Sequence, residues 1–169
     1  MATTQTPSGR GAGEGAIAVV AGHVPAQVGT KARSVATPVA SSPAALRRIC
    51  TRTPPDPMHY LSLDHALGNG KPTVVVFATP LLCTSRMCGP VVDEVTVAYQ
   101  ATGKQRANFI HVEIYPTRDA TKPALPFRRW GFQTEPWTIV IDRHGIIRAR
   151  FEGPVVAAQV RAALRPLLG

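Results

Sequence analysis

The sequence predicts an α/β fold, in which a central mixed β-sheet carries helices on both faces. Residues 73–78 (TVVVFA) form a short apolar run that is typical of a buried strand. Two strand-like segments flank the turn at 142–145 (DRHG), which predicts an antiparallel hairpin. Between the strand at 73–78 and this hairpin, apolar residues recur at helical spacing, namely Val91, Val92, Val95, Ala98 and Tyr99. This order implies that helices pack on both faces of the sheet.

The remaining elements follow from local patterns. Gly103 is expected to end the first long helix, because glycine tolerates the conformation that terminates helices. Residues 107–115 alternate as a second strand, with His111 and Glu113 on one face and isoleucine and valine side chains on the other. The predicted elements are a strand at 73–78, a helix ending near 102, a strand at 107–115, a short helix near 127–130, strands at 137–142 and 146–151, and a helix from 155 to near 165.

Composition divides the chain into two parts. Residues 1–55 are rich in Ala, Gly, Thr, Ser and Pro, which predicts a flexible N-terminal extension. Residues 56–169 are predicted to form a single folded domain, which a chain of 169 residues can accommodate. The sequence contains no apolar run long enough to predict a membrane-spanning helix. A charged start followed by a sustained apolar stretch is also absent, so no signal peptide is visible.

The net charge of +9 is spread along the chain. Residues 1–55 hold six Lys/Arg and one acid, giving +5, and residues 56–169 hold 13 Lys/Arg and nine acids, giving +4. No basic run alternates with aromatic residues, and no nucleic-acid motif is present. We therefore expect no nucleic-acid partner, while contact with a membrane stays open.

Three cysteines, Cys50, Cys83 and Cys88, are the candidates for chemistry. An odd number argues against a structural disulfide framework, whereas a close pair with one distant thiol suits a redox pair. Cys83 and Cys88 follow a buried strand and lie near the start of a helix, where the helix dipole and free N–H groups stabilise a thiolate. The sequence identifies no partner for Cys50, and His59 is expected at the surface.

The spacing of the pair limits its geometry. On a regular helix, residues five apart differ by about 140° around the axis and about 7.5 Å along it. Their Cα atoms then lie beyond the roughly 7 Å that a disulfide allows. Either Cys83 lies in the loop before the helix, which Pro80 favours, or the first helical turn unwinds on oxidation. Arg86 lies between the cysteines, where its charge favours a thiolate.

Several motifs resemble the thioredoxin superfamily over residues 60–169, among them VVVFA, PVVDEV and the hairpin EPWTIVIDRHGIIRARFEG. The chain is most similar to bacterial thioredoxin-domain proteins, often extracytoplasmic. Their motifs FATP, C-x4-CGPVVD, FIHVE and EPW stand at residues 77–80, 83–93, 109–113 and 135–137. The resemblance implies a thioredoxin-like three-layer sandwich and an extracytoplasmic or membrane-associated location. It also implies a thiol–disulfide oxidoreductase without a cofactor, whose partner is a protein thiol or disulfide.

The resemblance assigns roles to single residues. It implies that Cys83 is the attacking thiolate and that Cys88 is the resolving partner. Pro136 takes the place of the superfamily's cis-proline, which lies beside the active cysteines. Glu135, Pro136 and Trp137 are therefore expected to contact the substrate.

Two departures from the superfamily's pattern concern how protons are handled. The usual motif is C-x-x-C rather than C-x4-C, and Val76 stands where thioredoxins often carry a buried acid on the active-site strand. His111 and Glu113 share one strand face and are candidates to move protons in place of that acid. A hydrogen-bonded pair on a partly covered sheet face explains these two residues as well.

A different alignment and a different reaction remain open. Matching residues 88–91 (CGPV) to the motif C-G-P-C makes Cys88 the attacker, with valine in place of the second cysteine. Peroxiredoxins of the Q type share the cysteine spacing, and residues 79–84 (TPLLCT) resemble their T-P-x-C-T motif with one residue inserted. The fuller peroxidatic pattern P-x-x-x-T-x-x-C fails, because Val76 and Pro80 stand where it needs proline and threonine.

Two further readings belong to other functional classes. Copper chaperones of the cytochrome-oxidase assembly type combine a thioredoxin-like fold with two cysteines and a distant histidine, a donor set that suits copper. Their cysteines follow C-x-x-x-C, one residue closer than here, and no histidine is clearly placed, so the sequence assigns no metal ligands. A non-enzymatic interaction domain is the other reading, because C-x4-C is not the standard redox site.

Overall fold

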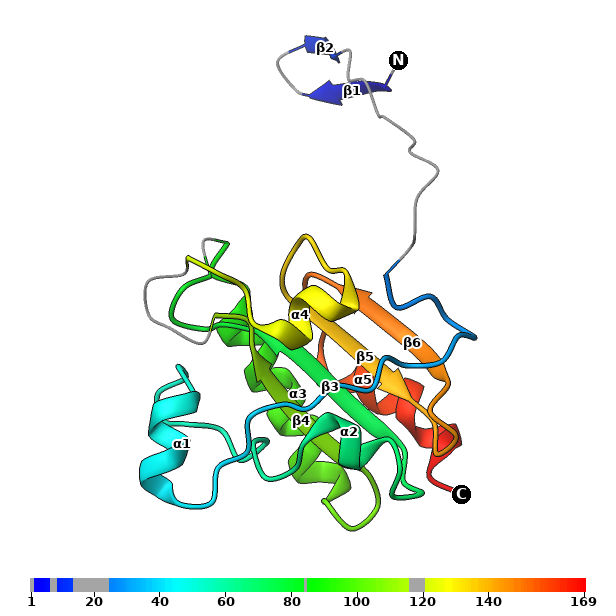
Figure 1. The fold of residues 1–169 in the computed structure, drawn as a ribbon. Coiled ribbons are helices and arrows are strands. Elements are labelled where there is room, and N and C mark those ends of the chain that lie inside the picture. The colour runs from blue at the N-terminus through cyan, green and yellow to red at the C-terminus, as the bar shows by residue number, and fades with distance from the viewer. Residues whose placement is uncertain (1, 7–8, 14–24, 84, 116–120) are drawn as a thin grey trace.

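A four-stranded mixed sheet lies at the centre of this computed structural model, which describes residues 2–6, 9–13, 25–83, 85–115 and 121–169 (Figure 1). Its strands are β3 (Thr73–Ala78), β4 (Asn108–Glu113), β5 (Trp137–Ile141) and β6 (Ile147–Glu152). The strand order is β4-β3-β5-β6, with β3 parallel to β4 and with β3–β5 and β5–β6 antiparallel. These strands confirm the four that the sequence predicts.

Helices cover both faces of the sheet, which confirms the predicted three-layer sandwich (Figure 1). They are α1 (Pro43–Ile49), α2 (Leu63–Ala66), α3 (Cys88–Thr102), α4 (Leu125–Trp130) and α5 (Ala157–Leu164), followed by a short 3₁₀ helix at Arg165–Leu167. Near the N-terminus, β1 (Ala2–Thr6) and β2 (Gly9–Gly13) form a separate antiparallel pair. No helix among the described residues has the length and apolar character to span a membrane.

Strand β3 is buried along its whole length because the sheet is covered on both sides. Val74 and Val76 pack into one core with the apolar faces of α3 and α5. Val75 and Phe77 point to the opposite face and pack with residues of α2 and α4. The continuous valine run of this strand therefore fills two cores rather than one.

Helix α3 begins directly at the second cysteine of the predicted pair. Pro90 lies in its first turn, where the missing N–H group of proline costs no helical hydrogen bond. The helix ends at Thr102 because Gly103 adopts a φ of 82° that side chains disfavour. The predicted end of this helix is confirmed.

Residues 25–55 pack against the domain, so the predicted boundary at residue 55 lies inside packed chain. Gly29 N–H donates to the Ile147 carbonyl at 2.9 Å, and Ile147 N–H donates to the Thr30 carbonyl at 3.0 Å. Lys31 also forms a bridge with Ile146 beside β6. Composition missed these contacts because backbone pairing needs no particular side chains. Residues 1, 7–8 and 14–24 of the predicted extension lie outside the described residues.

A second set of contacts joins this segment to α2. The buried Thr37 hydroxyl accepts a hydrogen bond from Leu63 N–H at 3.0 Å, at the N-terminus of that helix. Thr37 N–H in turn donates to the Ser62 hydroxyl at 2.8 Å. One threonine therefore satisfies a helix N–H that would otherwise be buried without a partner.

Replacing Thr37 by valine should therefore destabilise the protein. The variant keeps the side-chain shape but leaves Leu63 N–H buried without an acceptor, which costs about 1–3 kcal/mol of unfolding free energy. Thr30→Val is the control, because the exposed Thr30 hydroxyl donates to the nearby Gln27 carbonyl and to no other described residue, and it should cost less than about 0.5 kcal/mol. Urea unfolding measures both, and equal small effects would contradict the packing of residues 25–55.

Candidate functional site

The loop between β3 and α3 holds the first cysteine of the predicted pair. Cys83 lies in this loop, and Cys88 is the first residue of α3. The loop position is the one that lets the two sulfurs meet while the helix stays intact. Cys83 Sγ, Cys88 Sγ and a carboxylate oxygen of Glu135 all lie within 4.8 Å of one another. Both thiols are free.

The two thiols differ in exposure and in acidity. Cys83 keeps 8 % of its surface exposed, whereas Cys88 is fully buried. Burial acts to raise the pKa of the Cys83 thiol, but hydrogen bonds from Cys88 and Ser85 outweigh it and hold that pKa below its ordinary value. Burial, together with the bond to Cys83, raises the pKa of Cys88 well above its ordinary value. Cys83 therefore ionises more readily than Cys88.

Glu135 lies just before β5, the antiparallel neighbour of β3, and brings a carboxylate to this pair of cysteines. It precedes β5 through a cis peptide bond to Pro136, the isomer that the resemblance implies. Its Oε2 atom is buried and has no hydrogen-bond partner among the described residues. Burial raises the pKa of the Glu135 carboxyl; a hydrogen bond from Cys88 acts in the opposite sense, and the negative charge of Glu113 adds to the rise.

Two other predicted site residues are placed differently. Arg86 is exposed in the loop, with a left-handed φ of 57°, and the hydrogen bonds that lower the pKa of Cys83 come from other residues. Trp137 is only 4 % exposed and stacks on Phe132 with ring centroids 4.6 Å apart. Its indole ring is therefore part of the core on the α2 and α4 face rather than an open contact surface.

Glu113 connects strand β4 to the loop that carries Cys83. Its Oε1 atom accepts hydrogen bonds from Thr51, at 2.6 Å from the backbone N–H and at 2.9 Å from the hydroxyl. The same hydroxyl accepts from Leu81 N–H at 3.2 Å. The segment around Thr51 therefore contacts the loop only two residues before Cys83.

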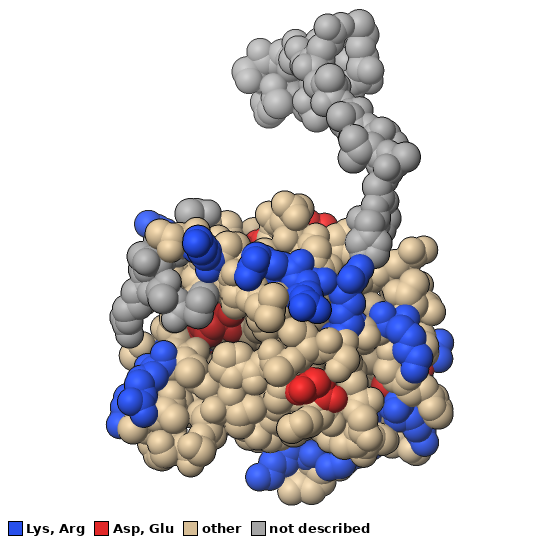
Figure 2. All heavy atoms as spheres, in the orientation of Figure 1, with Lys and Arg blue, Asp and Glu red and all other residues tan. Residues whose placement is uncertain are grey.

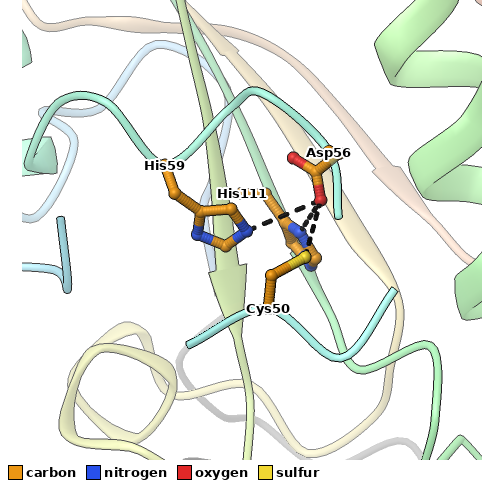
Figure 3. A group of neighbouring side chains, drawn as sticks. All are labelled: Cys50, Asp56, His59 and His111. Carbon is orange, nitrogen blue, oxygen red and sulfur yellow. Dashed lines mark hydrogen bonds and ion pairs between the residues drawn. The ribbon is translucent and has the colours of Figure 1, made fainter. Parts of the chain in front are cut away.

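His111 belongs to a second group of side chains and not to the Cys83–Cys88 pair (Figure 3). Its Nδ1 atom lies 2.7 Å from Asp56 Oδ2. Two further side chains converge on this oxygen: the Cys50 thiol donates to it at 3.2 Å, and His59 Nε2 lies 3.5 Å away. Ligand atoms of all four residues lie within 4.8 Å of one another, and all four residues are buried.

Charge balance explains how Asp56 is tolerated in the interior. Burial acts to raise the pKa of Asp56, but the histidines beside it hold that pKa far below its usual range. Burial acts in the opposite sense on His111, and the Asp56 carboxylate nevertheless raises the pKa of His111 well above its ordinary value. The buried carboxylate and imidazole thus form an ion pair that satisfies both groups.

At this second group, the expected surface position of His59 is wrong, and Cys50 has a partner that the sequence could not identify. His59 is 3 % exposed rather than at the surface, and Cys50 is buried with Asp56 as its partner. The signal that could have found them is the close spacing of Cys50, Asp56 and His59 in sequence. Their fourth member, His111, comes from the middle of a distant strand, and only the fold brings it to the others.

The charged surface shows no single dominant basic stripe on the face seen in Figure 2. Lys and Arg side chains stand at several separate places on this face, with acidic side chains between some of them. Unlike these surface charges, the Asp56 carboxylate and the histidines beside it are buried, so dissolved salt screens their interaction much less.

Comparison with known proteins bears on the architecture. No protein-family model matches the sequence, and no curated protein matches it. Among solved structures, a protein described as a thiol:disulfide interchange protein DsbE, from Chlorobium tepidum, is similar with a TM-score of 0.53 and 18 % identity, over 85 % of this chain and 99 % of that one.

Two thiol-disulfide isomerases from Corynebacterium glutamicum are also similar in structure. One is a secreted isomerase, with a TM-score of 0.52 and 14 % identity over 64 % of this chain and 75 % of that one. The other has a TM-score of 0.51 and 16 % identity over 66 % of this chain and 90 % of that one. Likeness at this level of identity establishes the architecture alone, and by that measure the chain has a thioredoxin-like fold.

Proposed function

We propose that this protein is a thiol–disulfide oxidoreductase that works through Cys83 and Cys88. The observation that carries the proposal is the asymmetry of the pair. A thiol with a lowered pKa lies in a loop, and a buried thiol with a raised pKa and a carboxylate lie within 4.8 Å of it. An attacking thiol needs a thiolate, and a resolving thiol must keep its proton until the mixed disulfide has formed.

The reaction proceeds in two exchange steps. The Cys83 thiolate attacks one sulfur of a partner disulfide, forms a mixed disulfide and releases the partner's other sulfur as a thiolate. The Cys88 thiol then loses its proton, attacks Cys83 Sγ and releases the second partner sulfur. The partner gains two electrons and the cysteine pair loses two. The two sulfurs must close from within 4.8 Å to about 2.05 Å.

Glu135 is the group that accepts the proton of Cys88. Its carboxyl lies beside both sulfurs, and its raised pKa brings it nearer to neutral pH, where a general base is most effective. It stands in for the acid that the central strand lacks at Val76. The unsatisfied Oε2 atom is consistent with a group that gains a hydrogen bond when it takes up a proton.

The substrate we propose is a protein disulfide rather than a small oxidant. Leu81, two residues before the reactive cysteine, exposes 51 % of its surface, which offers an apolar contact to a docked protein chain. A peroxidase of the Q type would need a threonine hydroxyl at the position of Pro80, and proline supplies none. Copper delivery lacks support, because no described histidine joins the Cys83, Cys88 and Glu135 group.

Alkylation should distinguish the two thiols. Because its pKa lies below the ordinary value, Cys83 should react with iodoacetamide at a pH below about 8.5, the value of an unperturbed cysteine. Cys88 should stay slow across that range. Trypsin cleaves after Arg86 and leaves the cysteines in separate peptides, so mass spectrometry follows each one. In Cys88→Ala, which removes the hydrogen bond from Cys88, the Cys83 profile should move to higher pH; in the unmodified protein, faster labelling of Cys88 than of Cys83 would reject the assignment.

Exchange activity should depend on both thiols in different ways. Cys83→Ser should abolish insulin reduction in the presence of dithiothreitol, because no attacking sulfur remains. Cys88→Ser should accumulate a mixed disulfide on Cys83, visible by mass spectrometry, because nothing resolves it. A parallel assay of peroxide consumption tests the peroxidase reading. Absence of insulin reduction by the unmodified protein would overturn the proposal, and inactivity in both assays would favour an interaction domain.

Glu135→Gln should slow the second exchange step alone. With 5,5′-dithiobis(2-nitrobenzoate), the first release of chromophore reports attack by Cys83 and the second reports resolution by Cys88. We expect the second release to slow by about 100-fold, as for loss of a general base, and to lose its dependence on the Glu135 pKa, while the first changes only slightly. Glu152→Gln is the control, since that exposed carboxylate bonds to Thr134 instead. Equal slowing of both releases would exclude this role.

A further inference from the structure

We propose that Cys50, Asp56, His59 and His111 form a binding site for a divalent transition metal ion, with Zn²⁺ as the best chemical match. The site is distinct from the Cys83–Cys88 pair and does not rest on the proposed exchange activity. It combines one thiolate, one carboxylate and two imidazoles, all buried (Figure 3). Thiolate, imidazole and carboxylate are all zinc ligands, and four of them suffice for the tetrahedral coordination that zinc prefers.

The distances between the ligand atoms are near those around a bound ion and need small adjustments in both directions. Ligand atoms around tetrahedral zinc lie roughly 3.3–3.8 Å apart, because each stands about 2.0–2.3 Å from the metal. In this group the four ligand atoms lie within 4.8 Å of one another. The Cys50–Asp56 and His59–Asp56 separations, 3.2 and 3.5 Å, are already close to that range. The His111–Asp56 separation of 2.7 Å has to widen.

His111 is already oriented as a ligand by its other ring nitrogen. Its Nε2 atom lies 3.1 Å from the Ala78 carbonyl oxygen, which can only accept, so Nε2 carries a proton and donates it. This bond leaves Nδ1 directed at the centre of the group. Histidines that bind metals commonly hold their second N–H against a backbone carbonyl in this way. The other Asp56 oxygen is likewise fixed, by a 3.0 Å bond from Met58 N–H.

His59 supplies an independent indication of a missing ligand. Its side chain is 98 % buried, since only 2 % of its surface is exposed. Its Nε2 atom points to the same centre, yet it makes no hydrogen bond with any described residue, and it lies 3.5 Å from Asp56 Oδ2. Buried polar atoms are almost always satisfied, so an orphan nitrogen within a cluster of three other donors needs a partner. A metal ion at the centre would satisfy it.

Binding exchanges protons for the ion without any redox change. The Cys50 thiol, which donates to Asp56 in the metal-free arrangement, loses its proton and binds as thiolate. His111 binds through Nδ1 and gives up whatever proton that atom shares with Asp56. The ion then takes the place of those protons as the positive charge that balances Asp56.

The site would join two parts of the chain that are distant in sequence. Cys50, Asp56 and His59 come from the segment before β3, whereas His111 lies in the middle of β4. Thr51, next to Cys50, accepts the hydrogen bond from Leu81 in the loop that carries Cys83. A bound ion would therefore hold the N-terminal segment on the sheet and stiffen the loop beside it.

The decisive experiment uses a full-length Cys83→Ser/Cys88→Ser variant, in which Cys50 is the only cysteine left. After removal of metal, titration with Co²⁺ should give one equivalent of tetrahedral d–d absorption and a thiolate-to-cobalt charge-transfer band, which only Cys50 can produce. Zn²⁺ should displace the cobalt. At a hundredfold excess over Kd, Zn²⁺ should raise Tm by about 5–10 °C.

Matched variants on the same background locate the ligands. His59→Gln should weaken Co²⁺ binding by about 100-fold or more, whereas His65→Gln, at an exposed histidine of α2, should leave it unchanged. X-ray absorption of the zinc-loaded unmodified chain counts the sulfurs without any substitution. One sulfur with three nitrogen or oxygen neighbours supports the site. Two sulfurs would place the ion at Cys83 and Cys88, and that result, or a double variant without the charge-transfer band, would overturn the proposal.

Discussion

The carboxyl end of β3 is the constraint on which both groups of side chains depend. The Ala78 carbonyl accepts from His111, and the Thr79 hydroxyl accepts from the backbone N–H groups of Ile114 and Tyr115. These bonds fix where the central strand stops and where the following loop leaves the sheet. Because that exit is fixed on both sides, Cys83 returns to the start of α3 at a distance from which a disulfide can close. Without it, the spacing of the two cysteines alone would not bring their sulfurs together.

Burial acts in different ways on the two groups. At the cysteine pair, two thiols with the same chemistry acquire unequal acidity, because one receives hydrogen bonds and the other lies wholly inside the core. In the second group, burial disfavours the charged form of Asp56, and the neighbouring histidines stabilise that form by balancing its charge. The buried surroundings thus give Cys83 and Cys88 different acidities, and they strengthen the attraction between Asp56 and the histidines beside it.

The strands and helices were predictable because their signals are local. The valine run of β3, the apolar spacing along α3 and the hairpin turn each lie within a few residues, so the sequence alone predicts the layered architecture. The loop position of Cys83 was one of the two arrangements that the cysteine spacing allowed. Glu135 was expected beside the substrate, but its proximity to both sulfurs depends on how β5 is laid against β3.

The N-terminal segment was the part that the sequence could not reveal. Its contacts are backbone hydrogen bonds, such as those of Gly29 and Thr30, or lone polar groups such as Thr37. Neither kind leaves a periodic pattern, and an Ala- and Pro-rich composition resembles that of disordered chain. The second group was missed for a related reason: Cys50, Asp56 and His59 acquire meaning only when His111 arrives from another strand.

The pairing of residues 29–32 with the start of β6 has a consequence for association between molecules. β6 is the outer strand of the sheet, and an open strand edge offers its N–H and C=O groups to any other extended chain. Gly29 and Thr30 form hydrogen bonds with both backbone groups of Ile147. The exposed Arg148 and Arg150 place positive charge on the next residues of β6. By pairing with the start of β6, residues 29–32 prevent a second molecule from adding a strand at that part of the sheet edge.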